Sequence, residues 1–480
     1  MVTRADPSPS AAGLIGAAGA THAAAIEDRL AAWEADVRKR CAKLAAAQAV
    51  GRVVEVSATL IVVRLPRAEI GHVCELGCED AYGNPMLAEV IGFNDSRTLL
   101  APLCSTQGLA PGMSVQSLGR AHDVAVGTHL LGQVLDGLGR PLGASAGIAS
   151  PDRHGHPPVM HAGKFVRRPV VASPPAPLAR PRIEMTLPTG IRAIDGALTL
   201  GRGQRIGLFA GPGCGKTTLI GALARGIDAD AIVLALVGER GRELNEFLER
   251  ALDSAAAART VVVCASAERA AMERVRAAFT ATAIAEGLGA QGAHVLLLVD
   301  SLTRVVRAQR EIGIAAGEPT GRAGLPPSVY ATLPRLTERA GTLPAGAITA
   351  VYTVLTESST LDPIAEEARS LLDGHIVLSS DLAQRGHFPA IDILSSTSRA
   401  MDTIVAESHR NDAARLRSLL SRHHDLQLLL TLGEYQPGHD AENDDAVARH
   451  PGLLAFLRQD TRTACAWRDT LEQLHAAVTD

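Results

Sequence analysis

A glycine-rich segment at residues 210–217 carries a lysine and a threonine where they could bind phosphate. It reads Ala-Gly-Pro-Gly-Cys-Gly-Lys-Thr, follows the apolar run Ile206–Ala210 and precedes a helical pattern. Glycines let backbone N–H groups turn toward phosphate oxygens, Lys216 can reach the terminal phosphates, and the Thr217 hydroxyl can ligate Mg²⁺. We therefore predict a Walker A loop that binds ATP, although Ala210 replaces the usual first glycine. Its predicted nucleotide contacts are Gly211, Pro212, Gly213, Cys214, Gly215, Lys216, Thr217 and Thr218.

A second apolar run ends in an acid that could bind the metal. Val295–Val299 is followed directly by Asp300. In a parallel sheet such an aspartate lies beside the phosphate loop, where Mg²⁺ and its waters are held. An apolar run before an aspartate is by itself usually only a strand and a turn, so this prediction depends on the loop upstream. Hydrolysis also requires a group that positions water in line with the γ-phosphate.

Apolar runs between about residues 201 and 392 predict the sheet that positions these residues. Strand-like runs alternate there with helical patterns, which is typical of a mainly parallel sheet covered by helices. The predicted fold class is therefore an α/β P-loop domain of the RecA-like type. The predicted strands are Ile206–Ala210, Ile232–Val237, Val261–Cys264, Val295–Val299, Ile348–Val354 and Ile376–Leu378.

The remaining segments predict smaller units around this domain. Residues 1–48 combine an Ala/Gly-rich flexible tail with one amphipathic helix. Residues 49–120 contain short β-branched and aliphatic runs between turn residues, which predict a small β-barrel. The ATPase domain is predicted at 121–400, with a proline-rich connector at about 156–188. Leucine-rich helical patterns predict a C-terminal helical domain at 401–480.

Composition excludes several classes of protein. The net charge of −4 and pI near 6.5 provide no electrostatic footprint for coating nucleic acid. No stretch approaches the roughly 20 apolar residues that a transmembrane helix needs. The seven cysteines are scattered and odd in number, as a reducing compartment permits. We therefore expect a cytoplasmic protein without a membrane span.

The residues after the strand 232–237 resemble a known family. Gly-Glu-Arg-Gly-Arg-Glu at 238–243 is similar to the catalytic β subunit of rotary ATP synthases and to the related export ATPases. In that family the first glutamate polarises the attacking water. The resemblance therefore implies a catalytic role for Glu239, with Lys216 binding phosphate and Arg240 as an organiser beside it. A solvated charged loop is the alternative interpretation of this segment.

Two further segments extend the resemblance to the rest of the nucleotide site. Ser395–Arg399 looks like the family segment that supplies an arginine finger across a subunit interface, which implies that role for Arg399. A guanidinium fork suits the charge that builds on the γ-phosphate. The resemblance also places Phe388 against adenine and Tyr435 in the same pocket. Both could equally be core aromatics, and Arg399 taken alone could be a surface charge.

The similarity covers roughly residues 49–460 and points to type III secretion ATPases and their flagellar export counterparts. It implies a homohexamer at the cytoplasmic base of a membrane-embedded export machine, associated with it peripherally. The implied partners are a stator-like regulator, a central stalk protein, and secreted substrates with their chaperones, which the enzyme would release and unfold. The phrase Gly433–Gln436 favours the injectisome branch over the flagellar one.

Two other functions share the same kind of motor domain. A nucleotide-binding ring subunit without hydrolytic activity is one, and Glu239 argues against it, because hydrolysis needs an acid at that place. A hexameric nucleic-acid translocase is the other. Single-strand binders use stacking aromatics and cationic tracks, whereas aromatic residues are 3% of this chain. We therefore expect no nucleic acid partner.

Overall fold

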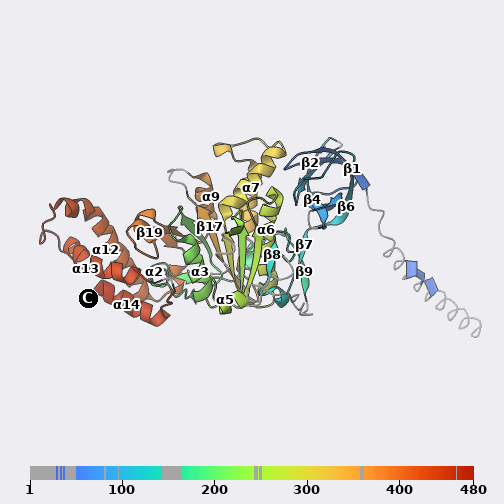
Figure 1. The fold of residues 1–480 in the computed structure, drawn as a ribbon. Coiled ribbons are helices and arrows are strands. Elements are labelled where there is room, and N and C mark those ends of the chain that lie inside the picture. Colours follow the sequence, from blue (N-terminus) through green and yellow to red (C-terminus); the bar gives the residue numbers. More distant parts are fainter. Residues whose placement is uncertain are drawn as a thin grey trace, which may run out of the picture.

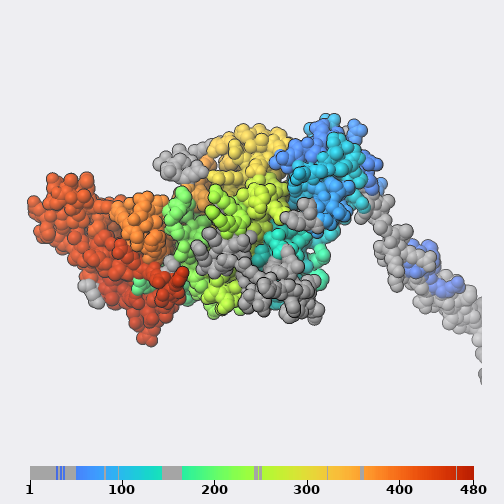
Figure 2. Space-filling view, in the orientation of Figure 1, coloured from blue at the N-terminus to red at the C-terminus, as the bar shows by residue number. Residues whose placement is uncertain are grey.

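The computed structural model describes residues 50–142 apart from 81, 82 and 96, and residues 165–479 apart from 243–246, 248–250, 357–361 and 461. Six residues between 29 and 37 are also described, all helical. The predicted tail and most of the predicted amphipathic helix lie outside the described residues. The described chain forms a β-barrel, a central α/β domain and a C-terminal helical domain. The barrel and the helical domain lie at opposite ends of the α/β domain (Figures 1 and 2).

The N-terminal unit is a closed antiparallel barrel with the strand order β1-β2-β5-β4-β3-β6. Its short β-branched and aliphatic runs alternate between an interior core and solvent, as half-buried strands do. The predicted barrel is thus confirmed. The strands are β1 (Val50–Val56), β2 (Ile61–Arg64), β3 (His72–Glu79), β4 (Pro85–Asn94), β5 (Arg97–Pro102) and β6 (Ser114–Ala121).

The chain passes from the barrel to the central domain through short strands. β7 (Asp123–Val126) pairs antiparallel with β9 (Val166–Pro169), and β8 (Val134–Asp136) joins the edge of the central sheet parallel to β14 (Thr260–Ala265). One buried ion pair also links the barrel to the central domain. Arg276 Nε lies 2.7 Å from Glu89 Oε2 of β4, and both side chains are buried.

The central sheet has the strand order β19-β18-β12-β17-β15-β13-β14-β8 in the described chain, and β16 pairs with β17. The seven strands β18, β12, β17, β15, β13, β14 and β8 are parallel to their neighbours in this order, while β19 is antiparallel to β18. The predicted strands are confirmed within one or two residues. Their bounds are β12 (Arg205–Ala210), β13 (Ala231–Val237), β15 (His294–Asp300), β16 (Gly341–Thr342), β17 (Ala347–Leu355), β18 (Gly374–Leu378) and β19 (Ile391–Ser398).

Helices cover both faces of this sheet, so its strands are apolar on both sides. One face packs against α6 (Ala271–Gly289), α7 (Leu302–Ala315), α8 (Pro327–Thr337) and α9 (Pro363–Leu371). The other packs against α2 (Arg192–Ala197), α3 (Lys216–Gly226) and α5 (Ser254–Ala258). Short helices α10 (Ser380–Gln384) and α11 (Met401–Ile404) flank β19. The predicted P-loop fold class is confirmed.

The C-terminal domain consists of α12 (Glu407–Leu432), α13 (Ala441–Leu457) and α14 (Trp467–Thr479). Buried leucines from α12 and α13 continue the core on the α2/α3 side of the sheet. Two histidines stack between the first two helices: the His423 and His450 ring centroids are 3.4 Å apart and nearly parallel. Among the residues that the structure describes, none of the helices has the length and apolarity that crossing a bilayer requires.

Candidate nucleotide-binding and catalytic site

The loop at 211–215 connects the central strand β12 to helix α3. Gly213 and Gly215 have φ of 76° and 86°, a region that favours glycine, and Gly215 is the N-cap of α3. The helix therefore begins at Lys216, and its free backbone N–H groups face the loop. Thr217 is exposed in the first turn. This geometry matches the predicted phosphate-binding loop.

Lys216 contacts two carboxylates at the carboxyl edge of the sheet. Its Nζ lies 2.5 Å from Asp300 Oδ1 and 3.5 Å from Glu239 Oε1. Asp300 ends β15, and Glu239 follows β13, which is the neighbouring strand. The Thr353 hydroxyl of β17 donates to Asp300 Oδ1 over 2.7 Å. Parallel strands thus bring residues from distant parts of the chain to one point, as predicted for Lys216 and Asp300.

Arg304 on α7 fixes the position of Glu239. Its Nη1 lies 2.7 Å from Glu239 Oε2, and the same nitrogen donates to the carbonyl of Gly238. Gly238 has φ of 68°, and a Cβ there would lie 2.9 Å from Arg304 Cδ. The close approach therefore requires glycine. The Ser301 hydroxyl caps α7 by accepting from the Arg304 amide.

These residues line a cleft with a volume of about 1140 Å³. Lys216, Thr217, Thr218, Glu239 and Asp300 all border it. Five cations and three carboxylates line the cleft, so it suits a ligand with several negative charges. The cations are Lys216, Arg225, Arg304, Arg307 and Arg462, and the acids are Glu239, Asp253 and Asp300.

A smaller groove of about 340 Å³ lies beside the first turn of α3. Phe388, Gly215 and Thr218 line it together. Phe388 is 43% exposed, so it is not a core aromatic. A Cβ at Gly215 would lie 3.9 Å from the Phe388 ring, which places the ring against the loop. The structure therefore brings Phe388 to the predicted nucleotide site.

Tyr435 lies elsewhere in this chain. It sits between α12 and α13, in the C-terminal domain, and is absent from the residues lining the cleft and the groove. Its hydroxyl donates to Asp444 Oδ1 over 2.5 Å, and this hydrogen bond is the main cause that raises the Tyr435 pKa to about 12. The prediction that Tyr435 shares a pocket with Phe388 is therefore not met within one chain, because Tyr435 closes the turn between two helices.

The two remaining predicted catalytic arginines lie outside the cleft of their own chain. Arg240 follows Glu239 and is exposed. Arg399 follows β19 and is exposed at the edge of the sheet, where its Nη2 donates to the Arg369 carbonyl over 3.3 Å. The structure therefore separates Arg399 from Lys216, Glu239 and Asp300.

Three family models match the chain. The ATP synthase alpha/beta family, nucleotide-binding domain, matches residues 190–398, and the β-barrel domain of that family matches residues 50–119. The T3SS EscN ATPase C-terminal domain matches residues 405–476. The type 3 secretion system ATPase of Pseudomonas syringae pv. syringae is 51% identical, over 92% of this chain and 96% of its own length. The chain belongs to the type 3 secretion system ATPase family.

Other relatives and solved structures agree with this assignment. The flagellum-specific ATP synthase of Bacillus subtilis is 43% identical over 86% of this ATPase and 91% of its own length. The assembled ATPase EscN of enteropathogenic E. coli is 43% identical, with a TM-score of 0.82 over 89% of this chain and all of that chain. EscN in complex with its central stalk EscO gives a TM-score of 0.78 at 42% identity, with the same coverage.

Sequence reasoning left five charged cleft residues of this ATPase unassigned: Arg225, Asp253, Arg304, Arg307 and Arg462. Arg304 and Arg307 line the cleft from α7, and neither was assigned to the nucleotide site. The available signal was the position of Arg304 in the sequence, four residues after Asp300 and in the first turn of the helix that follows β15. A helix that starts at the carboxyl end of a strand begins beside the ligand site of a parallel sheet.

Proposed function

We propose that this ATPase hydrolyses MgATP at the interfaces of a homohexameric ring and uses the energy for protein export. One observation carries the proposal: a single chain brings Lys216, Glu239 and Asp300 into one cleft but keeps Arg399 outside it. A site with binding loop, metal ligand and acid, but without the arginine finger, would be completed by a neighbouring copy.

The predicted magnesium ligands fit a Mg²⁺ ion that is shared with phosphates. Thr217 offers an exposed hydroxyl in the cleft, and Asp300 offers a carboxylate with one oxygen already bonded to Lys216 and Thr353. No cluster of three metal-binding side chains occurs among the described residues. Mg²⁺ needs none, because it commonly takes one or two protein oxygens together with phosphates and water. We assign Thr217 and Asp300 to this role.

Glu239 is proposed to hold the attacking water and accept its proton. In the structure its carboxylate contacts Lys216 and Arg304. A bound γ-phosphate would compete for both cations, because phosphate oxygens accept charge-assisted hydrogen bonds from ammonium and guanidinium groups. Glu239 would then be available as a base, and Arg240 beside it would help to organise the water.

The nucleotide would lie along the loop with its adenine against Phe388. The groove at Phe388 opens on Gly215 and Thr218, next to the phosphate-binding loop. An exposed aromatic ring offers a flat apolar surface on which a base can stack. The loop residues from Gly211 to Thr218 would contact the phosphates.

Arg399 is proposed to act in trans on the site of the adjacent subunit. Its side chain is exposed and has one long hydrogen bond to a carbonyl, so little has to be broken before it can turn to a phosphate. The solved structure of the relative EscN is that of an assembled ATPase. If this chain assembles as EscN does, Arg399 of one subunit would lie opposite the nucleotide cleft of the adjacent subunit.

The proposed partners follow those of the family. EscN has been solved with its central stalk EscO, and we propose a stalk protein, a stator-like regulator and chaperone-bound export substrates as partners of this ATPase. It would work on the cytoplasmic side of a membrane-embedded export machine. We favour an injectisome, since the Pseudomonas syringae type 3 secretion relative is 51% identical and the Bacillus flagellar relative 43%. A flagellar export machine is the alternative.

Phosphate release by the purified full chain tests this proposal. We expect turnover with Mg²⁺ and ATP, none with EDTA, and activity per subunit that rises as mass photometry shows assembly. Lys216→Ala is the matched inactive control. An assembled wild-type chain that releases no phosphate would contradict hydrolysis, and full activity of the monomer would contradict a shared site. Complementation of injectisome and flagellar deletion strains distinguishes the two branches.

A further inference from the structure

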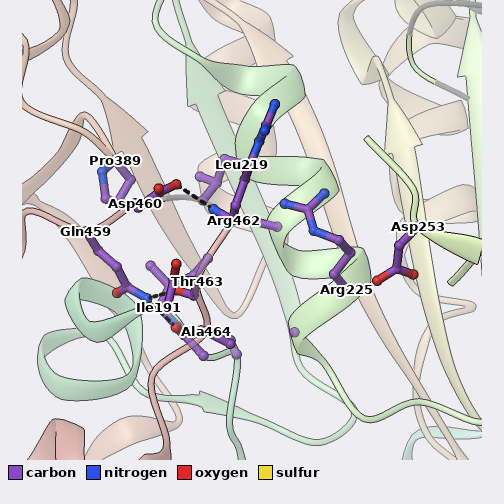
Figure 3. A pocket seen from close by; sticks show the side chains of 14 residues that line it. Ile191, Leu219, Arg225, Asp253, Pro389, Gln459, Asp460, Arg462, Thr463 and Ala464 are labelled. Carbon is purple, nitrogen blue, oxygen red and sulfur yellow. Dashed lines mark hydrogen bonds between the residues drawn. The ribbon is translucent and has the colours of Figure 1, made fainter. Parts of the chain in front are cut away.

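Arg462 reaches the nucleotide cleft from the C-terminal domain. It lies in the segment between α13 and α14, and it lines both the cleft and an adjoining pocket of about 230 Å³. That pocket runs along one face of α3, formed by Leu219, Ala222 and Arg225. Figure 3 shows the Arg462 side chain lying along α3, with Arg225 projecting from the same helix.

The segment that carries Arg462 is fixed to the nucleotide-binding domain. Gln459 donates two hydrogen bonds to that domain. Its backbone N–H donates to the Phe388 carbonyl over 2.9 Å, and its side-chain Nε2 donates to the Gly190 carbonyl over 2.7 Å. The Cys465 amide donates to the same Gly190 carbonyl over 2.9 Å. Gln459 and Cys465, which lie on either side of Arg462 in the sequence, are therefore both bonded to the nucleotide-binding domain.

A local turn sets the direction of the Arg462 backbone. Asp460 Oδ1 accepts a hydrogen bond from the Arg462 amide over 2.9 Å, which Figure 3 draws as a dashed line, and the Asp460 carbonyl accepts from the Thr463 amide over 3.1 Å. Aspartate commonly stabilises such turns by bonding to backbone two residues on. Both bonds tie the backbone at Arg462 and Thr463 to Asp460, which lines the groove beside Phe388.

Arg462 differs from the other cations of the cleft in its bonding. Lys216 and Arg304 contact carboxylates, and Arg225 donates to the Ala251 carbonyl. Arg307 also has a partner. Within the described chain, the Arg462 side chain has no hydrogen bond or ion pair. A guanidinium that faces a phosphate-binding cleft without a protein acceptor can take phosphate oxygens, which its planar fork fits.

We propose that Arg462 is a nucleotide-binding residue that contacts the phosphates of the nucleotide bound in the cleft of its own chain. Because the segment 459–465 joins α13 to α14, this contact would tie the C-terminal helical domain to nucleotide occupancy. The proposal rests on the proposed function, since it requires that the cleft bind ATP. It differs from the role of Arg399, which acts on a neighbouring subunit.

The test compares Arg462→Ala and Arg462→Lys with the matched control Arg468→Ala in the full chain. Arg468 is on α14 in the same domain, its side chain is 88% exposed, and its partner is Glu472. We expect Arg462→Ala to raise the KM for ATP and the calorimetric Kd for Mg-ADP about tenfold or more, the loss typical of one charge-assisted hydrogen bond. The kcat should stay unchanged, because binding is lost equally in ground and transition states.

A second measurement separates a phosphate contact from a merely structural role. Hydrogen exchange at residues 462–466 should slow when Mg-ADP is added to the wild type and to Arg462→Lys, and should not respond in Arg462→Ala. Equal Kd values for Arg462→Ala and wild type, or equal losses in Arg462→Ala and Arg468→Ala, would overturn the inference. A wild-type chain that binds no Mg-ADP would instead refute the proposed function.

Discussion

The nucleotide cleft and the β19 edge of the same sheet hold their charged residues in different ways. In the cleft, Lys216 lies between the carboxylates of Glu239 and Asp300, Arg304 contacts Glu239, and the Asp300 side chain is only 5% exposed. At the β19 edge, the Arg399 side chain is exposed, and its one hydrogen bond within the described residues is 3.3 Å long, to the Arg369 carbonyl. The cleft is therefore organised within one chain, whereas the edge is suited to act on another molecule.

The largest expected effect comes from removing the edge arginine. Arg399→Ala should lower kcat by about 10³–10⁵-fold, the range found for arginine fingers, while ATP binding to the subunit's own cleft stays intact. Phosphate release by assembled protein measures the first effect, and calorimetry with Mg-ADP measures the second. A large loss of nucleotide affinity would mean that Arg399 belongs to the nucleotide site of its own chain. The contrast between the cleft and the β19 edge would then be wrong.

Mixing experiments provide the control for Arg399. A ring of Arg399→Ala and Lys216→Ala chains contains interfaces at which both residues are intact, so activity should partly return. Absence of rescue in rings confirmed to contain both variants would refute action in trans.

Glu239→Gln should lower kcat by about 10²–10⁴-fold, the usual contribution of a general base. The substitution keeps the shape of the side chain and removes its charge, so Mg-ATP affinity should be retained or rise beside Lys216. Single-turnover phosphate release and ATP binding should be measured on the same preparation. Substantial residual turnover would show that another group in the cleft activates the water.

Arg304→Ala should lower kcat/KM by about 10–100-fold, since it removes one charged hydrogen bond that positions Glu239. Arg304→Lys retains the charge and should recover part of the loss, while Arg310→Ala on the same helix serves as the control. Arg310 lies outside the residues lining the cleft and donates to the Gly324 carbonyl. Equal effects of Arg304→Ala and Arg310→Ala would mean that α7 is needed only for stability.

The smallest effect concerns the helical domain, away from the cleft. Burial, and then the neighbouring His423, lower the His450 pKa to about 4. A depressed histidine pKa gives stability that is complete above about pH 6.5 and is lost as pH falls toward 4. His450→Gln should therefore reduce the fall in Tm between pH 7 and pH 4 by about 2–4 °C, because solvent screening leaves on the order of 1 kcal/mol.

Differential scanning calorimetry between pH 4 and pH 7 checks the His450 prediction. The Mg-ADP affinity at pH 7 shows whether the substitution also affects the nucleotide cleft. Unchanged affinity in His450→Gln would support the independence of the two regions. An identical pH dependence of Tm in the variant and the wild type would contradict the assigned role of His450.

Local patterns in the sequence were sufficient for the loop, the barrel and most strands of the central sheet. Lys216 and Asp300 could be placed together because parallel strands end at a common edge. Two strands in the main order of the sheet were not predicted. β8 pairs with β14, which is far away in the sequence, and β19 runs antiparallel beside β18. Their short or partly polar sequences carry no periodic signal for such pairing.

The same reasoning explains why some cleft residues were missed and why Tyr435 lies apart from the cleft of its own chain. Arg304 was overlooked because an arginine in an amphipathic helix looks like any solvated residue until the strand before it is located in the sheet. Tyr435 was assigned to adenine by resemblance, yet its hydroxyl bonds to Asp444 nine residues later, in a turn that local spacing alone does not locate. The position of Arg462 beside the cleft depends on tertiary contacts such as the hydrogen bond from Gln459 to Gly190, which lie 269 residues apart.

Closure of the N-terminal barrel limits how identical chains can contact one another through this domain. In the order β1-β2-β5-β4-β3-β6, the last strand pairs back to the first, so the described strands of this unit form a closed sheet without an open edge. Neighbouring copies of the barrel therefore cannot associate by adding strands to each other's sheet. Contacts between two barrels must therefore be made by side chains. Such contacts can form and break without unfolding either barrel.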